Sequence, residues 1–392
     1  MSTQQVRTSV DEVLQNAVDS GAVPNVAAIA ADRDGIIYEG AAGPRAAGGS
    51  DPVSVDTHFR IMSMTKMVAT VAALQLMERG DLDLDEPIET YRPEWAEMQV
   101  LDGFDGDTPR LRAPATKATV RHLITHTSGL GYWFFSEDIG RWEAHSGTPN
   151  VLSGENVIFS APLIADPGTK YEYGINTDWL GKVIEAASGL MLDAYIAEHI
   201  TRPLAMDETA FLMDERQCAN CVPVHLKGED GAWEVSDIDL RQDPEYFAGG
   251  HGLHSTPRDY LKFQRMLLGD GTSPNGVRIL SKETVDAAFS NQIGELDFPP
   301  EIATADPTST CDFNAGPNWK WGYGLLLNTE DLPGMRRAYS GAWAGLLNTH
   351  FWVDRSTGVT GAIYTQFLPF VTPEAFGIYQ DFERALYASL EG

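Results

Sequence analysis

The chain has 392 residues, 43% of them hydrophobic, with 37 glycines and 22 prolines. This composition is typical of a folded globular protein and argues against disorder, and no apolar stretch approaches the roughly 18–20 residues that a membrane span needs. The formal net charge of −28 would repel phosphate backbones. We therefore expect neither nucleic acid nor a membrane as a partner.

Residues 1–7 lack the apolar core and the cleavage site of a secretory signal, which predicts a cytoplasmic protein. The three cysteines, Cys218, Cys221 and Cys311, are too few for a disulfide framework. Residues 218–221 read C-x-x-C, but no second pair is present to complete a zinc site. We interpret the cysteines as free thiols in a reducing compartment, with a weak disulfide or a bound metal as the alternative.

Both ends of the chain predict helices and strands. Residues 3–20 carry apolar side chains at helical spacing, and Gly21 is typical of a helix end. Two pairs of short segments, each pair joined by a tight turn, predict two β-hairpins. The hairpin strands are expected at residues 26–31 and 35–40, and at residues 349–354 and 359–367. Residues 373–390 predict the last helix.

The middle of the chain predicts helices separated by loops rich in glycine and proline. Residues 67–79 are apolar on nearly every side and end at Gly80, which is typical of a buried helix. Further helices are expected at residues 120–126, 178–188, 192–200 and 257–268. Residues 102–114 and 294–319 are long connections rich in proline and aspartate, and such segments often form the walls or lids of active sites.

This order of elements predicts an α/β (α+β) protein in two parts. The ends of a chain usually meet in one sheet, whereas insertions protrude from it. Residues 1–60 and 320–392 are therefore expected to form a body with an antiparallel sheet flanked by the two terminal helices. Residues 61–319 are expected to form a mainly helical region with the long loops, packed on one side of the body with a cleft between.

Residues 63–66 read S-x-x-K directly before the buried helix. One helical turn separates Ser63 from Lys66, so the hydroxyl and the ammonium face the same side within hydrogen-bond reach. The helix N-terminus favours negative charge on the serine, and a lysine among apolar neighbours can lose its proton near neutral pH. So short a motif also arises by chance, and a capping serine followed by a surface lysine is the alternative. That alternative fits poorly with the apolar stretch that begins at Lys66.

Four sequence blocks in a fixed order resemble the serine β-lactamase and penicillin-recognising superfamily. They lie at residues 59–87, around the S-x-x-K motif, and at residues 122–132, 167–181 and 249–256. Within the superfamily the chain is most similar to class C β-lactamases and to the family VIII carboxylesterases that share their fold, over about residues 25–370. The resemblance implies a fold like that of β-lactamases and penicillin-binding proteins, and acyl transfer through an acyl-enzyme.

The resemblance also implies roles for individual residues. Ser63 would be the nucleophile, Lys66 its partner, and Tyr173 the general base and proton shuttle. A phenol can act as a base near neutral pH only if a cation stabilises its phenolate, and Lys66 is the candidate for that cation. Which of Lys66 and Tyr173 is the true base stays open. The implied oxyanion hole consists of the backbone N–H groups of Ser63 and Leu346.

Two positions depart from the β-lactamase pattern. Ile175 stands where β-lactamases have an asparagine two residues after the tyrosine, and Asn176 is expected to point elsewhere. Residues 343–345 read Trp-Ala-Gly in place of Lys-Thr-Gly, so the cation that would hold a β-lactam carboxylate is missing. A neutral ester is therefore the favoured substrate. Trp343 would line the acyl or alcohol pocket or else pack in the core, and Tyr132 would line the opposite wall.

The other motifs in the sequence give little evidence for a function. No G-x-S-x-G motif of the α/β-hydrolases occurs. His122 and His126 have the spacing of zinc ligands but lack the glutamate of H-E-x-x-H, so a capping or core role is expected. Asp102, Asp105 and Asp107 are interpreted as part of a solvated loop, with calcium binding as a remote alternative.

We therefore predict a serine carboxylesterase that hydrolyses short-chain or small carboxylic esters through an acyl-enzyme on Ser63. No metal or cofactor is expected, and the predicted partner is a small-molecule ester. The alternatives on the same nucleophile are a β-lactamase, a D-stereospecific peptidase or amidase, and an acyltransferase. A remoter alternative is a non-catalytic binding domain of the same fold. The sequence leaves the oligomeric state open.

Overall fold

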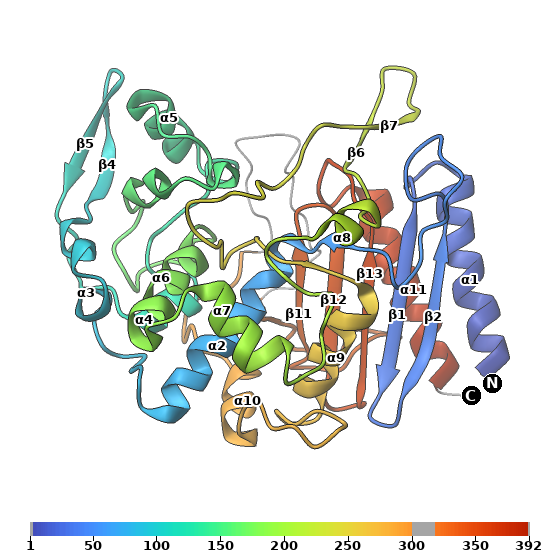
Figure 1. Ribbon diagram of the computed structural model, residues 1–392. Coiled ribbons are helices and arrows are strands. Elements are labelled where there is room, and N and C mark those ends of the chain that lie inside the picture. The colour runs from blue at the N-terminus through green and yellow to red at the C-terminus, as the bar shows by residue number, and fades with distance from the viewer. Residues whose placement is uncertain (1–2, 300–317, 391–392) are drawn as a thin grey trace.

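The computed structural model describes residues 3–299 and 318–390, and a seven-stranded antiparallel sheet forms the centre of this part of the chain (Figure 1). The strand order is β2-β1-β13-β12-β11-β10-β9. In that order the strands are Ile36–Ala42, Val26–Asp32, Val359–Tyr364, Thr349–Asp354, Gly341–Gly345, Leu326–Leu327 and Lys320–Trp321. The two ends of the chain meet where β1 pairs with β13, with Ala27 opposite Tyr364.

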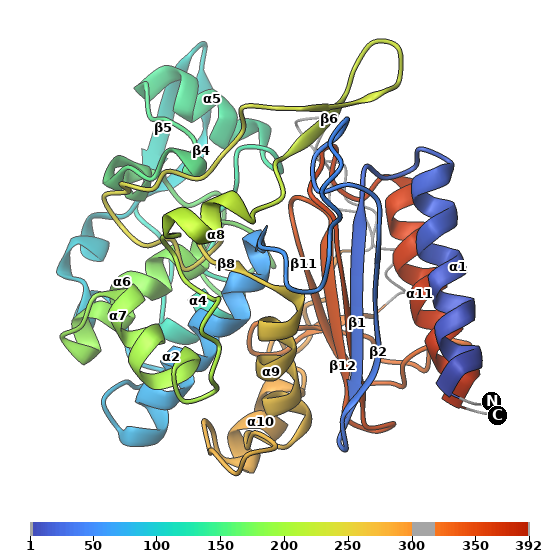
Figure 2. The same cartoon turned by 45° about the vertical axis from the view of Figure 1, so that its right-hand side comes forward.

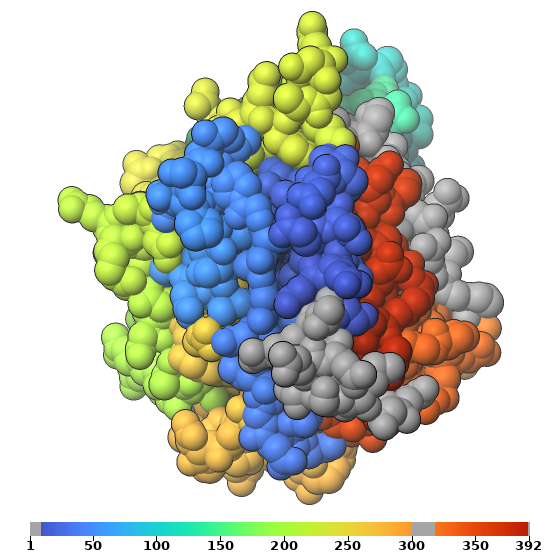
Figure 3. Space-filling view, turned by 90° about the vertical axis from the view of Figure 1, so that its right-hand side faces the viewer, coloured from blue at the N-terminus to red at the C-terminus, as the bar shows by residue number. Residues whose placement is uncertain are grey.

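Helices cover both faces of the sheet. Helices α1 (Thr3–Asp19) and α11 (Pro373–Leu390) lie against each other on one face, and α9 (Pro257–Leu268) lies on the other (Figure 2). The space-filling view shows α1 in blue and α11 in red side by side on the outside of the molecule (Figure 3). Helix α9 is held to the sheet by Gln264, whose amide donates to Thr360 Oγ1 at 2.8 Å and to the Gly361 carbonyl at 3.0 Å.

The remaining helices form a region beside the α9 face of the sheet. Its buried centre is α2 (Thr65–Arg79), which packs against α6 (Asn176–Ser188) and α7 (Leu192–Ile196). The other helices are α3 (Ile88–Tyr91), α4 (Val120–Ile124), α5 (Glu137–Ser146), α8 (Glu215–Ala219) and α10 (Lys282–Ala288). Short 3-10 helices are η1 (Met62–Met64), η2 (Pro93–Glu97), η3 (Val151–Ser153) and η4 (Asn156–Ser160), and a π-helical turn, η5 (Ala197–Thr201), extends α7.

Three two-stranded sheets complete the described secondary structure. They pair β3 (Phe59–Arg60) with β8 (His254–Ser255), β4 (Val100–Asp105) with β5 (Thr108–Arg112), and β6 (His225–Lys227) with β7 (Trp233–Val235). The first pair matters most for the site, because it joins the segment before Ser63 to the segment after residue 250.

The predicted antiparallel sheet, built from both ends of the chain and flanked by the terminal helices, is confirmed. The prediction of an irregular loop at residues 102–114 is wrong, because β4 and β5 form a hairpin there. Their side chains are largely exposed, so the alternation of apolar and polar residues that identifies a strand is absent. The long connection at 294–319 lies mostly outside the described residues. Helix α9 belongs to the stretch 61–319 assigned to the helical region, yet it packs on the sheet.

Cys218 and Cys221 are free thiols, and Cys311 lies outside the described residues. Burial raises the pKa of the Cys221 thiol to about 11, so this thiol stays protonated near neutral pH. Across the described segments, no helix has the length and apolar character needed to cross a membrane.

A buried ion pair fastens α11 to the segment between β10 and β11. Glu383 is 1% exposed and accepts from the backbone N–H of Arg336 at 2.9 Å and from its guanidinium at 2.6 Å. Tyr379 accepts a further hydrogen bond from the same guanidinium at 2.8 Å. Because both charges are withdrawn from water, each depends on the other for compensation.

Substitution Glu383→Ala is therefore expected to lower the free energy of unfolding by about 3–5 kcal/mol, since it leaves the Arg336 charge buried and unpaired. Urea unfolding followed by circular dichroism measures the change. Arg384→Ala is the control in the same helix turn: it removes an exposed pair with Asp381 and should have little effect. Equal losses of unfolding free energy in the two variants would contradict the structural role of the buried pair.

Candidate active site

The S-x-x-K motif lies where η1 runs into α2. Ser63 is partly exposed, whereas the residues on both sides of it are buried. Met62, directly before it, has a φ of 47°, a left-handed conformation that is unusual for a residue with a side chain. Such strain persists only where the surroundings hold it in place, and it often marks functional sites. The local fold thus leaves one serine partly exposed at the start of a buried helix.

Lys66, one turn further on, is 1% exposed, so the surface-lysine alternative is wrong. Its side-chain nitrogen donates to three oxygens, which are Ser63 Oγ at 3.1 Å, Tyr132 Oη at 3.0 Å and the Gly250 carbonyl at 2.7 Å. Burial lowers the pKa of Lys66, and the nearby negative charge of Asp178 raises it in part. The motif is therefore a buried amine in direct contact with the hydroxyl of a partly exposed serine.

Tyr173 lies beside this amine, as the order of the sequence blocks predicted. The Lys66 nitrogen is 4.7 Å from the centre of the Tyr173 ring, and the phenol oxygen accepts a hydrogen bond from Trp343 Nε1 at 3.0 Å. The Tyr132 and Tyr173 rings meet edge to face at 5.4 Å between centres. Segments around residues 63, 132, 173 and 343 thus converge on one place.

The two residues expected to line the substrate pocket both contact this cluster. Tyr132 accepts a hydrogen bond from Lys66, so its contact with the site goes beyond the pocket-lining role that the sequence predicted. Burial raises the pKa of Tyr132 above its usual range, which keeps its phenol neutral. Trp343 is 5% exposed and packs edge to face on Trp321 at 4.6 Å, in addition to its hydrogen bond to Tyr173. Trp343 therefore packs in the core and also contacts the site.

Strand β11 ends next to the serine. A Cβ atom at Gly345 would overlap the Ile61 carbonyl and would lie 3.0 Å from Met62 Cβ. A glycine here therefore lets the strand approach η1 closely, and Leu346 follows directly. This places the residue predicted to complete the oxyanion hole beside the segment that carries Ser63.

Asn176 points away from the amine, as expected. Its amide nitrogen donates to the Leu130 carbonyl at 3.3 Å and to the Glu172 carbonyl at 3.2 Å. Its amide oxygen accepts from Ser128 Oγ at 2.6 Å. Asn176 therefore fixes the loop before Tyr132 to the segment that contains Tyr173.

The histidines near the site are held neutral. Burial, with a smaller contribution from the Lys66 charge, lowers the pKa of His251 to about 3 and that of His126 well below its usual range. His122 caps α4, accepting from the Thr119 N–H at 3.0 Å, and His126 packs in the core against Tyr173. These are the capping and core roles that the sequence predicted. The described residues contain no group of three or more candidate metal ligands.

Asp178 is the charged residue of the site that sequence reasoning missed. It lies in the first turn of α6, is 1% exposed, and accepts from the Gly250 N–H at 3.0 Å. Its position five residues after Tyr173 is visible in the sequence, but an acidic residue in a first helical turn is ordinarily explained by the helix dipole. Its burial beside a buried amine could not be read from that pattern.

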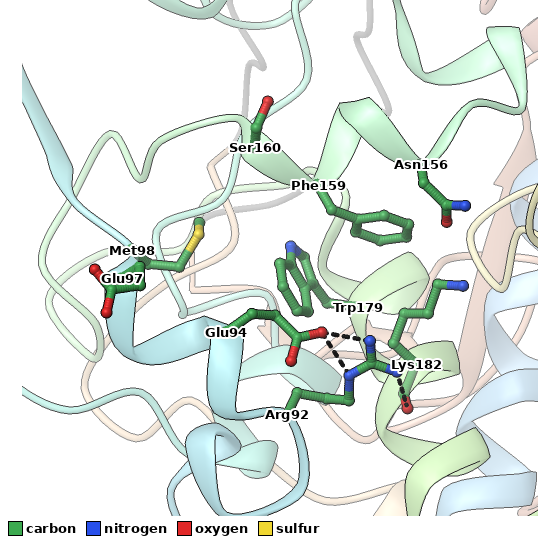
Figure 4. Close-up of a pocket in the computed structure, with 9 residues that line it drawn as sticks. All are labelled: Arg92, Glu94, Glu97, Met98, Asn156, Phe159, Ser160, Trp179 and Lys182. Carbon is green, nitrogen blue, oxygen red and sulfur yellow. Dashed lines mark hydrogen bonds and ion pairs between the residues drawn. The ribbon is translucent and has the colours of Figure 1, made fainter.

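A separate cavity of about 630 Å³ lies against α6, between η2 and η4 (Figure 4). Its wall includes Trp179 and Lys182 of α6, together with Arg92 and Phe159. None of the Ser63, Lys66 or Tyr173 side chains lines it. Trp179, part of the third sequence block, accordingly packs on Trp95 at 4.8 Å and Phe159 at 5.1 Å, outside the serine site.

Comparison with known proteins identifies the family of this chain. The model of the beta-lactamase family matches residues 10–386. The monacolin J acid methylbutanoyltransferase of Aspergillus terreus is 31% identical over an alignment of 400 positions, which covers 97% of this chain and 96% of that protein. The lovastatin esterase of Penicillium rubens is 32% identical over 370 residues, which cover 90% and 91% of the two chains.

Solved structures agree. The simvastatin synthase LovD of Aspergillus terreus, in its LovD6 variant, superimposes with a TM-score of 0.85 at 31% identity, covering 98% of this chain and 95% of the other. EstCE1, described as a hydrolase with promiscuous acyltransferase activity, shares the fold with a TM-score of 0.76 at 20% identity, covering 98% and 99%. The resemblance drawn from the sequence is confirmed: this chain belongs to the beta-lactamase family, among the serine β-lactamase-like enzymes that hydrolyse or transfer acyl groups.

Proposed function

We propose that this protein is a serine acyltransferase, which moves an acyl group from an ester donor to a hydroxyl acceptor through an acyl-enzyme on Ser63. The observation that carries the proposal is the 3.1 Å hydrogen bond between the Lys66 nitrogen and Ser63 Oγ inside a buried cluster. A desolvated amine next to a partly exposed hydroxyl is the arrangement that makes a serine nucleophilic.

The hydrogen bonds suggest how the proton moves. When Lys66 is neutral it has two N–H donors, which match Tyr132 and Gly250, and its lone pair is free for the Ser63 hydroxyl. Ser63 Oγ attacks the ester carbonyl as its proton passes to Lys66, and a Ser63 Oγ–carbon bond forms. The bond to the leaving alcohol breaks as that alcohol receives a proton, with Tyr173 as the proposed shuttle.

In the second half of the reaction the acceptor hydroxyl attacks the acyl-enzyme. Its proton passes to the base, the bond to Ser63 breaks, and Ser63 recovers its hydrogen. The N–H groups of Ser63 and Leu346 are proposed to stabilise the oxyanion in both halves. If water takes the place of the acceptor, the same steps hydrolyse the ester.

The comparisons favour transfer over the carboxylesterase that the sequence placed first. The relative from Aspergillus terreus and the matching simvastatin synthase are named for acyl transfer or synthesis. Hydrolysis of a small ester is the second candidate, and the lovastatin esterase supports it. A β-lactam substrate is disfavoured because residues 343–345 carry no lysine for its carboxylate.

Competition between an alcohol and water tests the two candidates. The enzyme is incubated with p-nitrophenyl butyrate and rising concentrations of a panel of alcohols, and the products are identified by mass spectrometry. We expect the butyrate ester of an acceptor alcohol to form at the expense of free butyrate, and Ser63→Ala to form neither. Free butyrate alone with every acceptor would support the carboxylesterase. Turnover of a chromogenic cephalosporin without ester cleavage would contradict both.

Lys66→Ala and Tyr173→Phe are expected to lower kcat by about 10²-fold or more, since each removes a proposed proton carrier. Circular dichroism checks that the fold is kept, and a fluorophosphonate probe reports the reactivity of Ser63. Loss of labelling in Lys66→Ala is expected because the probe depends on an activated hydroxyl. Full activity in either variant would show that its role is misassigned.

Gly345→Ala is expected to lower kcat by about 10²-fold, because the new Cβ pushes the end of β11, and with it the Leu346 N–H, away from Ser63. Gly341→Ala is the matched control at the other end of the same strand, where the atoms nearest to a Cβ belong to the Leu325 and Phe289 side chains and not to the backbone. Thermal unfolding compares the stability costs of the two variants. Equal losses of kcat would contradict an oxyanion role for this strand end.

A further inference from the structure

Asp178 and Lys66 both hydrogen-bond to the backbone of Gly250. The Gly250 N–H donates to Asp178 Oδ1 at 3.0 Å, and the carbonyl of the same residue accepts from Lys66 at 2.7 Å. Within the part of the chain that the structure describes, no ion pair of 4.0 Å or less joins the two side chains directly. The backbone of Gly250 is therefore the bridge between the carboxylate and the amine.

Two glycines make this approach feasible. A Cβ at Gly250 would lie 2.5 Å from Asp178 Oδ2 and 2.9 Å from Oδ1, and a Cβ at Gly249 would lie 2.5 Å from the Thr177 carbonyl. Neither position has a positive φ, so the requirement for glycine comes from packing against the first turn of α6. This contact explains the two glycines that open the fourth sequence block.

Asp178 is the carboxylate that acts on the Lys66 charge. The other titratable groups around Lys66 are Tyr132, Tyr173, His126 and His251. The histidines are neutral near pH 7 and the Tyr132 phenol is kept protonated by burial. Desolvation lowers the pKa of Lys66, and the attraction of Asp178 opposes it. The pKa of Asp178 is itself raised, chiefly by burial.

We propose that Asp178 is a positioning residue, which sets the charge of Lys66 and holds the Gly250 carbonyl against it. This inference rests on the proposed acyl transfer by Ser63 and adds the group that decides the pH range of that reaction. Only neutral Lys66 can take the Ser63 proton, so the acylation rate rises as the pH rises through the pKa of Lys66. Removing the negative charge destabilises the ammonium and moves that rise to lower pH.

The test measures the pH dependence of Ser63 acylation, with p-nitrophenyl butyrate for kcat/KM and a fluorophosphonate for labelling. Asp178→Asn keeps an acceptor oxygen for the Gly250 N–H but removes the charge. We expect the rise of its acylation rate with pH, the acid limb of the pH profile, to lie about one pH unit below that of the unmodified protein. Asp354→Asn is the matched control, because Asp354 is a fully buried carboxylate in β12, and its acid limb should not move.

Asp178→Glu keeps the negative charge but changes the size of the side chain, so it separates these two effects. It also provides a second test if Asp178→Asn does not fold. It retains the charge but crowds Gly250, so we expect a lower kcat with the acid limb unchanged. An unchanged acid limb in Asp178→Asn, or a shifted limb in Asp178→Glu, would overturn the inference. Failure of the proposed acyl-enzyme on Ser63 looks different, because the unmodified protein would then show no labelling of Ser63 at any pH. Formation of free butyrate alone would replace transfer by hydrolysis and leave the test of Asp178 in acylation unchanged.

Discussion

The burial of a single ammonium group is the constraint on which the site depends. Lys66 is withdrawn from water, and its hydrogen bonds go to Ser63, Tyr132 and Gly250, which come from three separate parts of the chain. A buried charge without such partners is costly, so the contacts that compensate it also hold these segments together. The group proposed to move the proton is thus the one that assembles its surroundings.

Close backbone approach is the second requirement. At Gly345 the end of β11 meets η1, and at Gly250 a loop meets the first turn of α6. In each case any side chain would separate two segments that the proposed mechanism needs together. The sheet supplies one side of the site and the helical region the other, with Ser63 at their junction. The fold therefore serves the chemistry by bringing main chains, and not only side chains, into contact.

The sequence predicted the architecture and the placement of Ser63, Lys66 and Tyr173, because hydrophobic periodicity and the order of four blocks are local signals. It missed the β4–β5 hairpin, whose exposed strands lack apolar alternation. It treated Tyr132 only as a pocket wall and missed Asp178. Tyr132 hydrogen-bonds to Lys66, and Asp178 is linked to Lys66 through Gly250, but in each case the two residues are far apart in the chain. Contacts of that kind depend on the packed tertiary structure, which no local pattern encodes.

The pairing of β1 with β13 has a consequence for how the protein is made. The β1–β2 hairpin is synthesised long before its partner strand β13, because most of the described chain lies between them. Until then the inner edge of β1 exposes unpaired N–H and carbonyl groups on an apolar strand, a template for unwanted pairing with other chains. The central sheet therefore cannot be completed before β13 has been synthesised, and until then this edge needs protection from other chains.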